Sequence, residues 1–178
     1  MTSLTAFTIL VALVALERLA ELVVSNRNAA WSFERGGWET GRGHYPFMVV
    51  LHSGFLVAML VEAWVLRPDV QPTLAWTMLA LVVASQALRW WCIATLGRRW
   101  NTRVIIVPGL PPVTAGPYRF LSHPNYVAVV VEGFALPLVH GAWVTALVFT
   151  VANAALLAVR IRVENAALRT LPGRFADA

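Results

Sequence analysis

Five hydrophobic stretches, separated by short polar segments, dominate the chain. A helix needs roughly 20 mostly apolar residues to cross a bilayer, and four of the stretches meet that length while the fourth in order is shorter. The pattern therefore predicts an all-α integral membrane protein with about five transmembrane helices, folded as a single domain over residues 1–178. The stretches cover residues 4–24, 46–66, 72–96, 124–139 and 141–163.

The fourth and fifth stretches are joined only by a turn around Pro137, His140 and Gly141. Two hydrophobic helices with so short a connection run antiparallel and side by side. We therefore expect a tight helical hairpin whose first helix does not reach the far side of the membrane. Pro124 stands at the start of that helix, where proline is favoured because it has no N–H to lose.

The basic residues are distributed unevenly along the chain. All fourteen are arginine, and this exclusive use of arginine with abundant Ala and Val suggests a GC-rich bacterial source. Eleven, including Arg174, lie in the loops after the first and third stretches and in the C-terminal tail, against Arg67 alone on the other side. Arginine-rich loops remain in the cytoplasm. We expect a bacterial cytoplasmic membrane protein with its N-terminus outside and its C-terminus inside.

Ionisable side chains gather in the cytoplasmic half of the predicted helices, and only Glu62 falls toward the opposite face. Charges at such depth are costly unless they are paired or line a cavity. We expect a polar pocket that faces the cytoplasm. Structural pairs, of Glu17 or Glu21 with Arg89 and of Glu132 with Arg160, would explain the same charges without a pocket. The residues are Glu17, Arg18, Glu21, His52, Arg89, Glu132 and Arg160.

Several classes of function are excluded by what the sequence does not contain. It has no Gly-rich phosphate loop, no GxGxxG motif and no HExxH motif. Its four histidines are dispersed, and its one cysteine, Cys92, excludes a disulfide framework and a multi-cysteine metal site. The dispersed histidines and the single cysteine therefore predict no metal site. Because the arginines form no basic run, we expect no nucleic-acid partner either.

Two polar motifs flank the predicted hairpin. GPYRFLSHPNY (116–126) precedes it, and RIRVE (160–164) follows it. Together they resemble the isoprenylcysteine carboxyl methyltransferase family, integral-membrane enzymes that use S-adenosylmethionine. Ser122 stands where that family has an arginine, and Asn165 where it has a second glutamate; Arg119 or Arg162 could replace the missing arginine. The matching positions are Gly116, Tyr118, Arg119, His123, Pro124, Tyr126, Arg160, Ile161 and Glu164.

The resemblance implies a cofactor region at about residues 97–171 and a cytoplasm-facing pocket for S-adenosylmethionine. Glu164 can accept hydrogen bonds from the ribose diol or the ammonium group of the cofactor, and Arg160 or Arg162 can bind its carboxylate as a fork. Tyrosine rings can stack beside it. The residues expected to bind the cofactor are Tyr118, His123, Pro124, Tyr126, Arg162 and Glu164.

Longer segments, among them ERLAELVVSNRN and LGRRWNTRVIIVPG, resemble a bacterial branch of the family found beside type III polyketide synthases. That likeness implies a lipophilic alkylpyrone or alkylresorcinol acceptor, with such a synthase as a pathway partner. An enol or phenol that is not ionised needs a base, for which His52 is the first candidate, Glu132 the second and His123 the third. We expect His52, Glu132 and Arg160 to serve the reaction.

Three other functions are compatible with the sequence. Carboxyl methylation of an isoprenylcysteine-like acceptor would need no base. A membrane reductase of related fold would need a basic cluster for the 2′-phosphate of NADPH, which Arg98, Arg99 and Arg103 could supply. A structural or lipid-binding membrane protein would leave His123 and Glu164 without a ligand.

Overall fold

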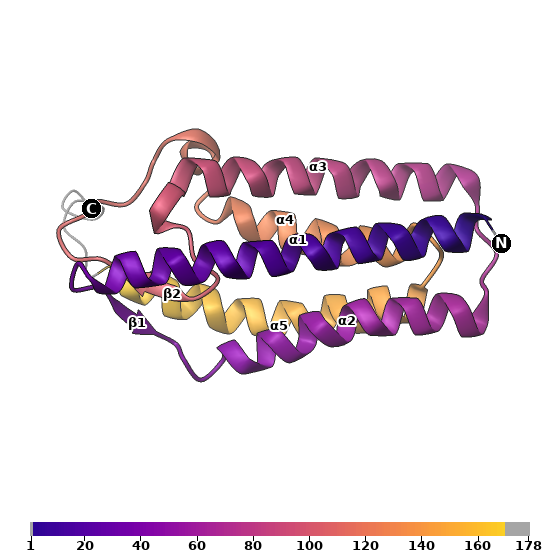
Figure 1. Ribbon diagram of the computed structural model, residues 1–178, viewed down its shortest axis with the longest axis horizontal. Coiled ribbons are helices and arrows are strands. Elements are labelled where there is room, and N and C mark those ends of the chain that lie inside the picture. The colour runs from indigo at the N-terminus through magenta and orange to yellow at the C-terminus, as the bar shows by residue number, and fades with distance from the viewer. Residues whose placement is uncertain (1, 170–178) are drawn as a thin grey trace.

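The computed structural model describes residues 2–169, so Arg174 and the last two residues of the predicted cofactor region lie outside the described part. Five α-helices within that part run side by side as an elongated bundle (Figure 1), which confirms the predicted all-helical class. Their bounds are α1 Thr2–Phe33, α2 Tyr45–Leu66, α3 Pro72–Leu96, α4 Pro124–Leu138 and α5 Trp143–Leu168.

Three of the described helical segments are long and apolar enough to cross a membrane: Tyr45–Leu66, Pro72–Arg99 and Trp143–Leu168. The α4 helix is apolar but has 15 residues, in agreement with the short fourth stretch of the sequence. The α1 helix is long, but charged residues interrupt its apolar face, and its role as a further span stays a prediction. Exposed Trp64, Trp76 and Trp143 gather where α2 ends and where α3 and α5 begin, as expected of an interfacial belt.

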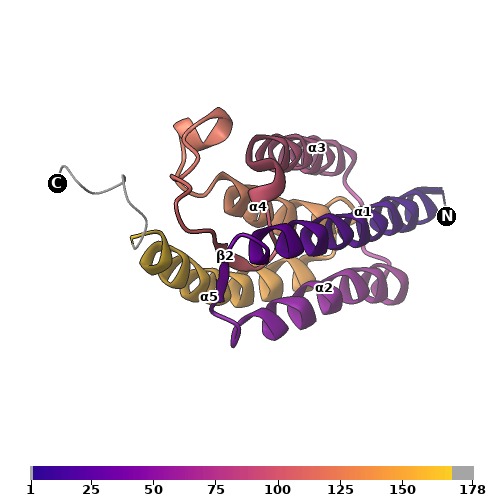
Figure 2. The same ribbon diagram turned by 60° about the vertical axis from the view of Figure 1, so that its left-hand side comes forward.

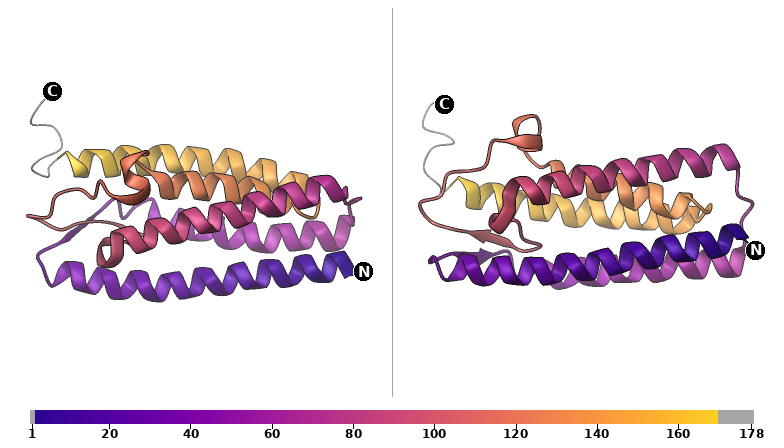
Figure 3. Two further views of the ribbon diagram at one scale, coloured as in Figure 1. Left: turned by 90° about the horizontal axis from the view of Figure 1, so that it is seen from above. Right: turned by 45° about the horizontal axis from the view of Figure 1, so that its top comes forward.

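The predicted hairpin is present, with α4 packed between α3 and α5 (Figure 3). The chain reverses between Val139 and Ala142, where Gly141 takes a positive φ of 73°. Gly133 lets the two helices approach closely, because a Cβ at this position would overlap the ring of Phe149. The hairpin therefore holds both sequence motifs, at the start of α4 and the end of α5, next to each other.

The two ends of the bundle differ in character. The start of α1, the α2–α3 connection and the α4–α5 turn lie at one end, while the longer loops and the end of α5 lie at the other (Figures 1 and 2). We call the second the loop end. There β1 (Trp38–Thr40) and β2 (Val104–Ile106) pair antiparallel, with Trp38 opposite Ile106. The hydrophobic pattern did not predict these strands, because each has three residues.

Short polar contacts fix the loop after α3 onto α1. The 3₁₀ turn η1 (Gly97–Arg99) follows α3 directly. Asn28 Nδ2 donates to the carbonyl of Trp100 at 2.7 Å, and the backbone N–H of Thr102 donates to Ser25 Oγ at 3.0 Å. Asn28 and Ser25 are buried. These bonds hold the loop over the interior of the bundle, where it forms one wall of the candidate site.

Candidate functional site

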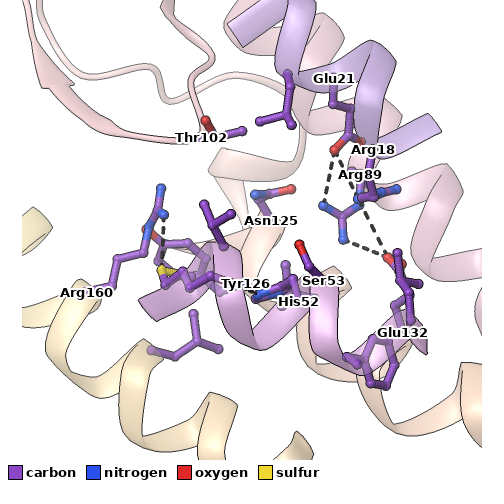
Figure 4. Close-up of a pocket in the computed structure, with 18 of the residues that line it drawn as sticks. Arg18, Glu21, His52, Ser53, Arg89, Thr102, Asn125, Tyr126, Glu132 and Arg160 are labelled. Atoms are coloured by element: carbon purple, nitrogen blue, oxygen red, sulfur yellow. Dashed lines mark hydrogen bonds and ion pairs between the residues drawn. The ribbon is translucent and has the colours of Figure 1, made fainter. Parts of the chain in front are cut away.

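A cavity of about 210 Å³ lies inside the loop half of the bundle and is lined by residues from all five helices (Figure 4). We call it the deep cavity. His52 from α2, Glu132 from α4 and Arg160 from α5 all line it. The structure thus brings together the three residues predicted to serve the reaction.

An ion-pair cluster forms one side of the deep cavity. Arg89 donates to Glu132 Oε2 at 2.7 Å and lies 3.8 Å from Glu21 Oε2, which in turn lies 3.1 Å from Arg18 (Figure 4). Of the structural pairs considered as an alternative to a pocket, Glu21 with Arg89 is present, and it lies beside a cavity. The predicted pairing of Glu132 with Arg160 is wrong, because Glu132 points toward α3 and α1 while Arg160 lies near the start of α4.

His52 lies apart from this cluster. Its Nδ1 is 2.8 Å from the carbonyl oxygen of Met48, an atom that can only accept a hydrogen bond. The neutral ring therefore carries its proton on Nδ1, and Nε2 keeps a lone pair. The edge of the ring contacts Phe149, with the centroids 5.2 Å apart and the planes at 89°. This arrangement leaves His52 able to accept a proton at Nε2.

Arg160 is buried at the loop end of α5 and faces α4. Its Nε donates to the hydroxyl of Tyr126 at 2.7 Å, and its Nη1 lies 3.5 Å from Met48 Sδ. The Tyr126 hydroxyl donates in turn to the carboxylate of Glu164. A tyrosine of the first motif therefore connects the arginine and the glutamate of the second.

A second cavity, of about 120 Å³, lies beyond this connection, and we call it the outer cavity. Tyr118, His123, Tyr126 and Glu164 line it together with β2. The His123 ring stacks on Tyr126, with centroids 5.1 Å apart. Four of the six residues predicted to bind the cofactor therefore surround one space.

Asn165, one of the two departures from the family pattern, has a clear role in this arrangement. Its Oδ1 lies 2.9 Å from Nε2 of His123, whose Nδ1 is 3.7 Å from Glu164 Oε1. The amide oxygen can accept a hydrogen bond from Nε2, which holds the other ring nitrogen toward Glu164. An amide at position 165 therefore orients the histidine that the family motif supplies.

The other two residues predicted to bind the cofactor, Pro124 and Arg162, take different places. Pro124 is buried as the first residue of α4 and lines neither cavity. Arg162 is exposed and also lines neither, so the structure does not bring it to the site. Tyr118 lies in the 3₁₀ turn η2 (Gly116–Arg119), where burial raises the pKa of its hydroxyl. Tyr118 therefore stays protonated and can donate a hydrogen bond.

The two cavities share a wall made of five residues. Tyr126 and Arg160 belong to the predicted set, whereas Trp100, Asn101 and Asn125 do not. Trp100 Nε1 and Asn125 Oδ1 are buried without a hydrogen-bond partner among the described residues. Asn125 stands inside the HPNY motif, and Trp100 and Asn101 stand inside the segment LGRRWNTRVIIVPG, so their positions gave a signal, although none of the three was predicted to be a site residue.

Comparison with known proteins agrees with these motifs. Residues 78–170 match the sequence profile of the isoprenylcysteine carboxyl methyltransferase (ICMT) family. The chain is 38% identical over 164 residues to the uncharacterized protein YpbQ of Bacillus subtilis, covering 92% of this chain and 96% of that protein. It is 26% identical over 155 residues to an uncharacterized protein of Haemophilus influenzae, covering 86% and 90%. No solved structure matches.

The chain therefore belongs to the ICMT family. Membership implies a methyltransferase, and the apolar helices agree with an enzyme of the membrane. The names of the two relatives do not identify an acceptor, and the predicted link to type III polyketide synthases stays a prediction.

Proposed function

We propose that this protein is an S-adenosylmethionine-dependent O-methyltransferase that acts on a lipophilic acceptor with an acidic hydroxyl, of the alkylpyrone or alkylresorcinol type. A type III polyketide synthase would then supply the acceptor. The observation that carries the proposal is His52, whose Nε2 is left as a hydrogen-bond acceptor by the bond between Nδ1 and Met48. Such a group can take the proton of a hydroxyl as the oxygen is methylated.

The residues around the outer cavity fit the chemistry of S-adenosylmethionine. Glu164 offers a carboxylate for an ammonium or a diol, and the stacked rings of His123 and Tyr126 offer an aromatic surface. Arg160 offers a guanidinium for a carboxylate. When bound, the cofactor supplies a methyl group on a sulfonium centre, which is activated for displacement.

The outer cavity is smaller than the 300–1,000 Å³ or so that is typical of small-molecule sites. Its outer wall includes β2, whose one partner strand among residues 2–169 is the three-residue strand β1. Gly36 and Gly41 stand on either side of β1 and both have a positive φ. We therefore expect the two strands to move outward when the cofactor binds.

The wall between the cavities is where methyl donor and acceptor would meet. Tyr126 and Arg160 line both spaces, so a ligand on either side would contact them. Val14, Phe55, Leu56, Phe149 and Leu157 give the deep cavity the apolar surface that a hydrocarbon chain needs. The chain's own contribution would be to hold the acceptor oxygen near this wall, exclude water and accept the proton at His52.

Carboxyl methylation of an isoprenylcysteine-like acceptor is the second candidate function. It is supported by Arg160, whose guanidinium lies at the junction of the two cavities and could bind a carboxylate. A carboxylate is already ionised, so this reaction would not use His52 as a base. The dependence of turnover on His52 therefore separates the two acceptor classes.

The geometry does not favour an NADPH-dependent reductase. Arg103 lines the outer cavity, where its Nη1 lies 3.4 Å from Glu39. Arg98 and Arg99 line a different hollow, which does not include Arg103. The three arginines therefore do not form the single cluster that binding of the 2′-phosphate of NADPH would require.

Calorimetric titration of the detergent-purified protein tests the proposal. We expect S-adenosylmethionine to bind and NADPH not to bind; no heat of binding at millimolar S-adenosylmethionine would reject the proposal. Labelled cofactor should then transfer its methyl group to an alkylpyrone. Transfer to a farnesylcysteine analogue instead would identify the second candidate function.

A further inference from the structure

A third hollow, of about 450 Å³, lies at the loop end of the bundle, outside both cavities of the candidate site. It is formed where the ends of α1 and α3 meet the segment that follows β2. We call it the basic groove, because three of its eight residues are arginines. The lining residues are Trp31, Arg35, Leu96, Arg98, Arg99, Val107, Pro108 and Leu110.

The guanidinium groups of the basic groove are largely available to a ligand. Arg98 makes no ion pair or hydrogen bond with another described residue, and Arg99 uses Nη1 to donate to the carbonyl of Pro111 at 2.7 Å. Arg35 stacks over the ring of Trp31 at 4.3 Å and donates to its carbonyl at 3.2 Å. One carboxylate, the exposed Glu34, lies 3.8 Å from Arg35. The three guanidinium groups of the groove are therefore balanced by one nearby carboxylate, which leaves an excess of positive charge for a ligand.

The groove lies at the end of a segment that is long and apolar enough to cross a membrane. The apolar span that contains α3 ends at Arg99, so Arg98 and Arg99 are the last two residues of a segment able to cross the bilayer. Trp31 stands at the corresponding end of α1, and tryptophan is enriched at membrane interfaces. Leu96, Val107 and Leu110 add apolar walls beside the arginines.

We propose that the basic groove binds the phosphodiester headgroup of an anionic phospholipid, such as phosphatidylglycerol, from the leaflet next to the loop end. Arginine binds phosphate oxygens through paired N–H donors, and basic pockets at the ends of membrane helices suit anionic headgroups. The apolar walls suit the glycerol backbone and the first methylene groups of a lipid. A fully soluble phosphate would leave those walls exposed to water.

A lipid in this position would also contact the structure around the outer cavity. Leu96 lines both the basic groove and the outer cavity, and Val107 follows β2 directly along the chain. A bound headgroup would therefore hold the segment from Val104 to Leu110 in place. The inference does not depend on which acceptor is methylated.

Thermal unfolding of the detergent-purified full chain tests the lipid site. Phosphatidylglycerol added to the micelles should raise the unfolding temperature, and phosphatidylcholine should not. In the double variant Arg35→Gln/Arg98→Gln we expect the concentration of phosphatidylglycerol needed for half the shift to rise by about fivefold for each arginine removed. Arg27→Gln, an exposed arginine of α1 outside the groove, should respond like the wild type.

Three results would overturn the proposal. An unchanged phosphatidylglycerol response in the double variant would place the lipid elsewhere. An equal response to phosphatidylcholine would mean that the anionic charge is not selected. An equal stabilisation by millimolar inorganic phosphate would assign the groove to a soluble anion. The three arginines replaced in these variants, Arg27, Arg35 and Arg98, are all exposed, so we expect each variant without lipid to unfold near the wild-type temperature.

Discussion

Arg160 and Tyr126 are joined by a 2.7 Å hydrogen bond that links α5 to α4. Because the Tyr126 hydroxyl also donates to Glu164, this tyrosine physically connects two sequence motifs that are 34 residues apart. The connection gives a structural reason for the two motifs to occur together. It also places an arginine and a glutamate on one wall of the outer cavity, where they can bind opposite charges of one ligand.

Replacing Tyr126 with phenylalanine should separate the two motifs while keeping the packing of the ring. Arg160 and Glu164 would both lose a hydrogen bond, and a bond to a charged group is worth about 1.5–3 kcal/mol. We expect S-adenosylmethionine to bind roughly ten- to a hundredfold more weakly in calorimetry. Tyr45→Phe is the matched control, since Tyr45 lines only the deep cavity and bonds to the neutral Thr102. Equal losses in both variants would contradict the proposed role of Tyr126.

Two glutamates of the site should respond differently to removal of their charge. Glu164 lines the outer cavity, and Glu164→Gln should weaken cofactor binding by roughly ten- to a hundredfold. Glu132 is paired with Arg89 at 2.7 Å on the far side of the deep cavity. Glu132→Gln should therefore leave cofactor affinity nearly unchanged, lower turnover and reduce stability, because breaking a buried pair costs roughly 3–5 kcal/mol.

Calorimetry and thermal unfolding, measured on both variants, check this contrast. Loss of cofactor binding in a folded Glu132→Gln protein would mean that the two cavities act as one site. The structure has already changed the expected role of Glu132. Its partners are Arg89 and Arg18 rather than Arg160, so it positions the charged wall of the deep cavity, and His52 is the better candidate for the base.

Removing the base should change the pH dependence of the reaction. For a hydroxyl acceptor, wild-type turnover rises with pH as His52 loses its proton, because the neutral ring accepts the proton at Nε2. His52→Gln should lower turnover by roughly 10²- to 10⁴-fold and flatten this rise, while cofactor affinity stays near that of the wild type. Steady-state rates from about pH 5 to pH 9 measure both effects. A turnover rate of His52→Gln equal to that of the wild type would favour a carboxylate acceptor, which needs no base.

The sequence predicted the hairpin from a local pattern, the short apolar stretch after Pro124 and the brief turn that follows it. Most of the site was expected because the two motifs beside the hairpin resemble those of the ICMT family, which implied that His123, Tyr126 and Glu164 serve one ligand. Which charged side chains form ion pairs inside the bundle could not be predicted in the same way. Glu132 pairs with Arg89 rather than Arg160 because of the rotation of α4, and a hydrophobic helix carries no strong periodic signal for its rotation.

Contacts made by loops were missed for a different reason. Trp100 and the residues that lead into β2 are positioned by hydrogen bonds between the side chains of Asn28 and Ser25 and the backbone after α3. Two small polar residues on a long helix do not indicate a distant partner in the sequence. The exposed Arg162 shows the opposite error, since a residue within a motif can still face away from the site.

Glu62 should stabilise the end of the bundle opposite the loops. It is buried, and its carboxylate accepts hydrogen bonds from the backbone N–H groups of Val144 and Thr145 and from the Thr145 hydroxyl, at 2.7–3.0 Å. It thus caps the N-terminus of α5 from α2. Glu62→Ala leaves buried donors unsatisfied, at about 1–3 kcal/mol each.

Thermal unfolding should show this loss, and cofactor affinity should stay unchanged because the site is at the other end. Asp69→Asn is the control, as an exposed acidic residue near the same end. An unfolding temperature for Glu62→Ala that equals that of the control would show that the cap contributes little.

The orientation of the bundle in its membrane can be tested with single cysteines. The native Cys92 is fully buried and is removed as Cys92→Ala so that only the introduced thiol reacts. Gln71 lies in the α2–α3 connection and Pro108 in the loop after β2, and both are exposed. Thr102 would be a poor choice, because its hydroxyl and backbone N–H are bonded to Ser25.

Gln71→Cys and Pro108→Cys lie at opposite ends of the bundle, so an impermeant maleimide should distinguish them in intact cells. The arginine-rich loops predict that the loop end faces the cytoplasm. Gln71→Cys should therefore react from outside, and Pro108→Cys only after the membrane is permeabilised. The basic groove and the outer cavity would then face the side of the membrane where S-adenosylmethionine is made. The reverse labelling pattern would place both on the outside, away from the cofactor, and would contradict the proposed function as well as the orientation.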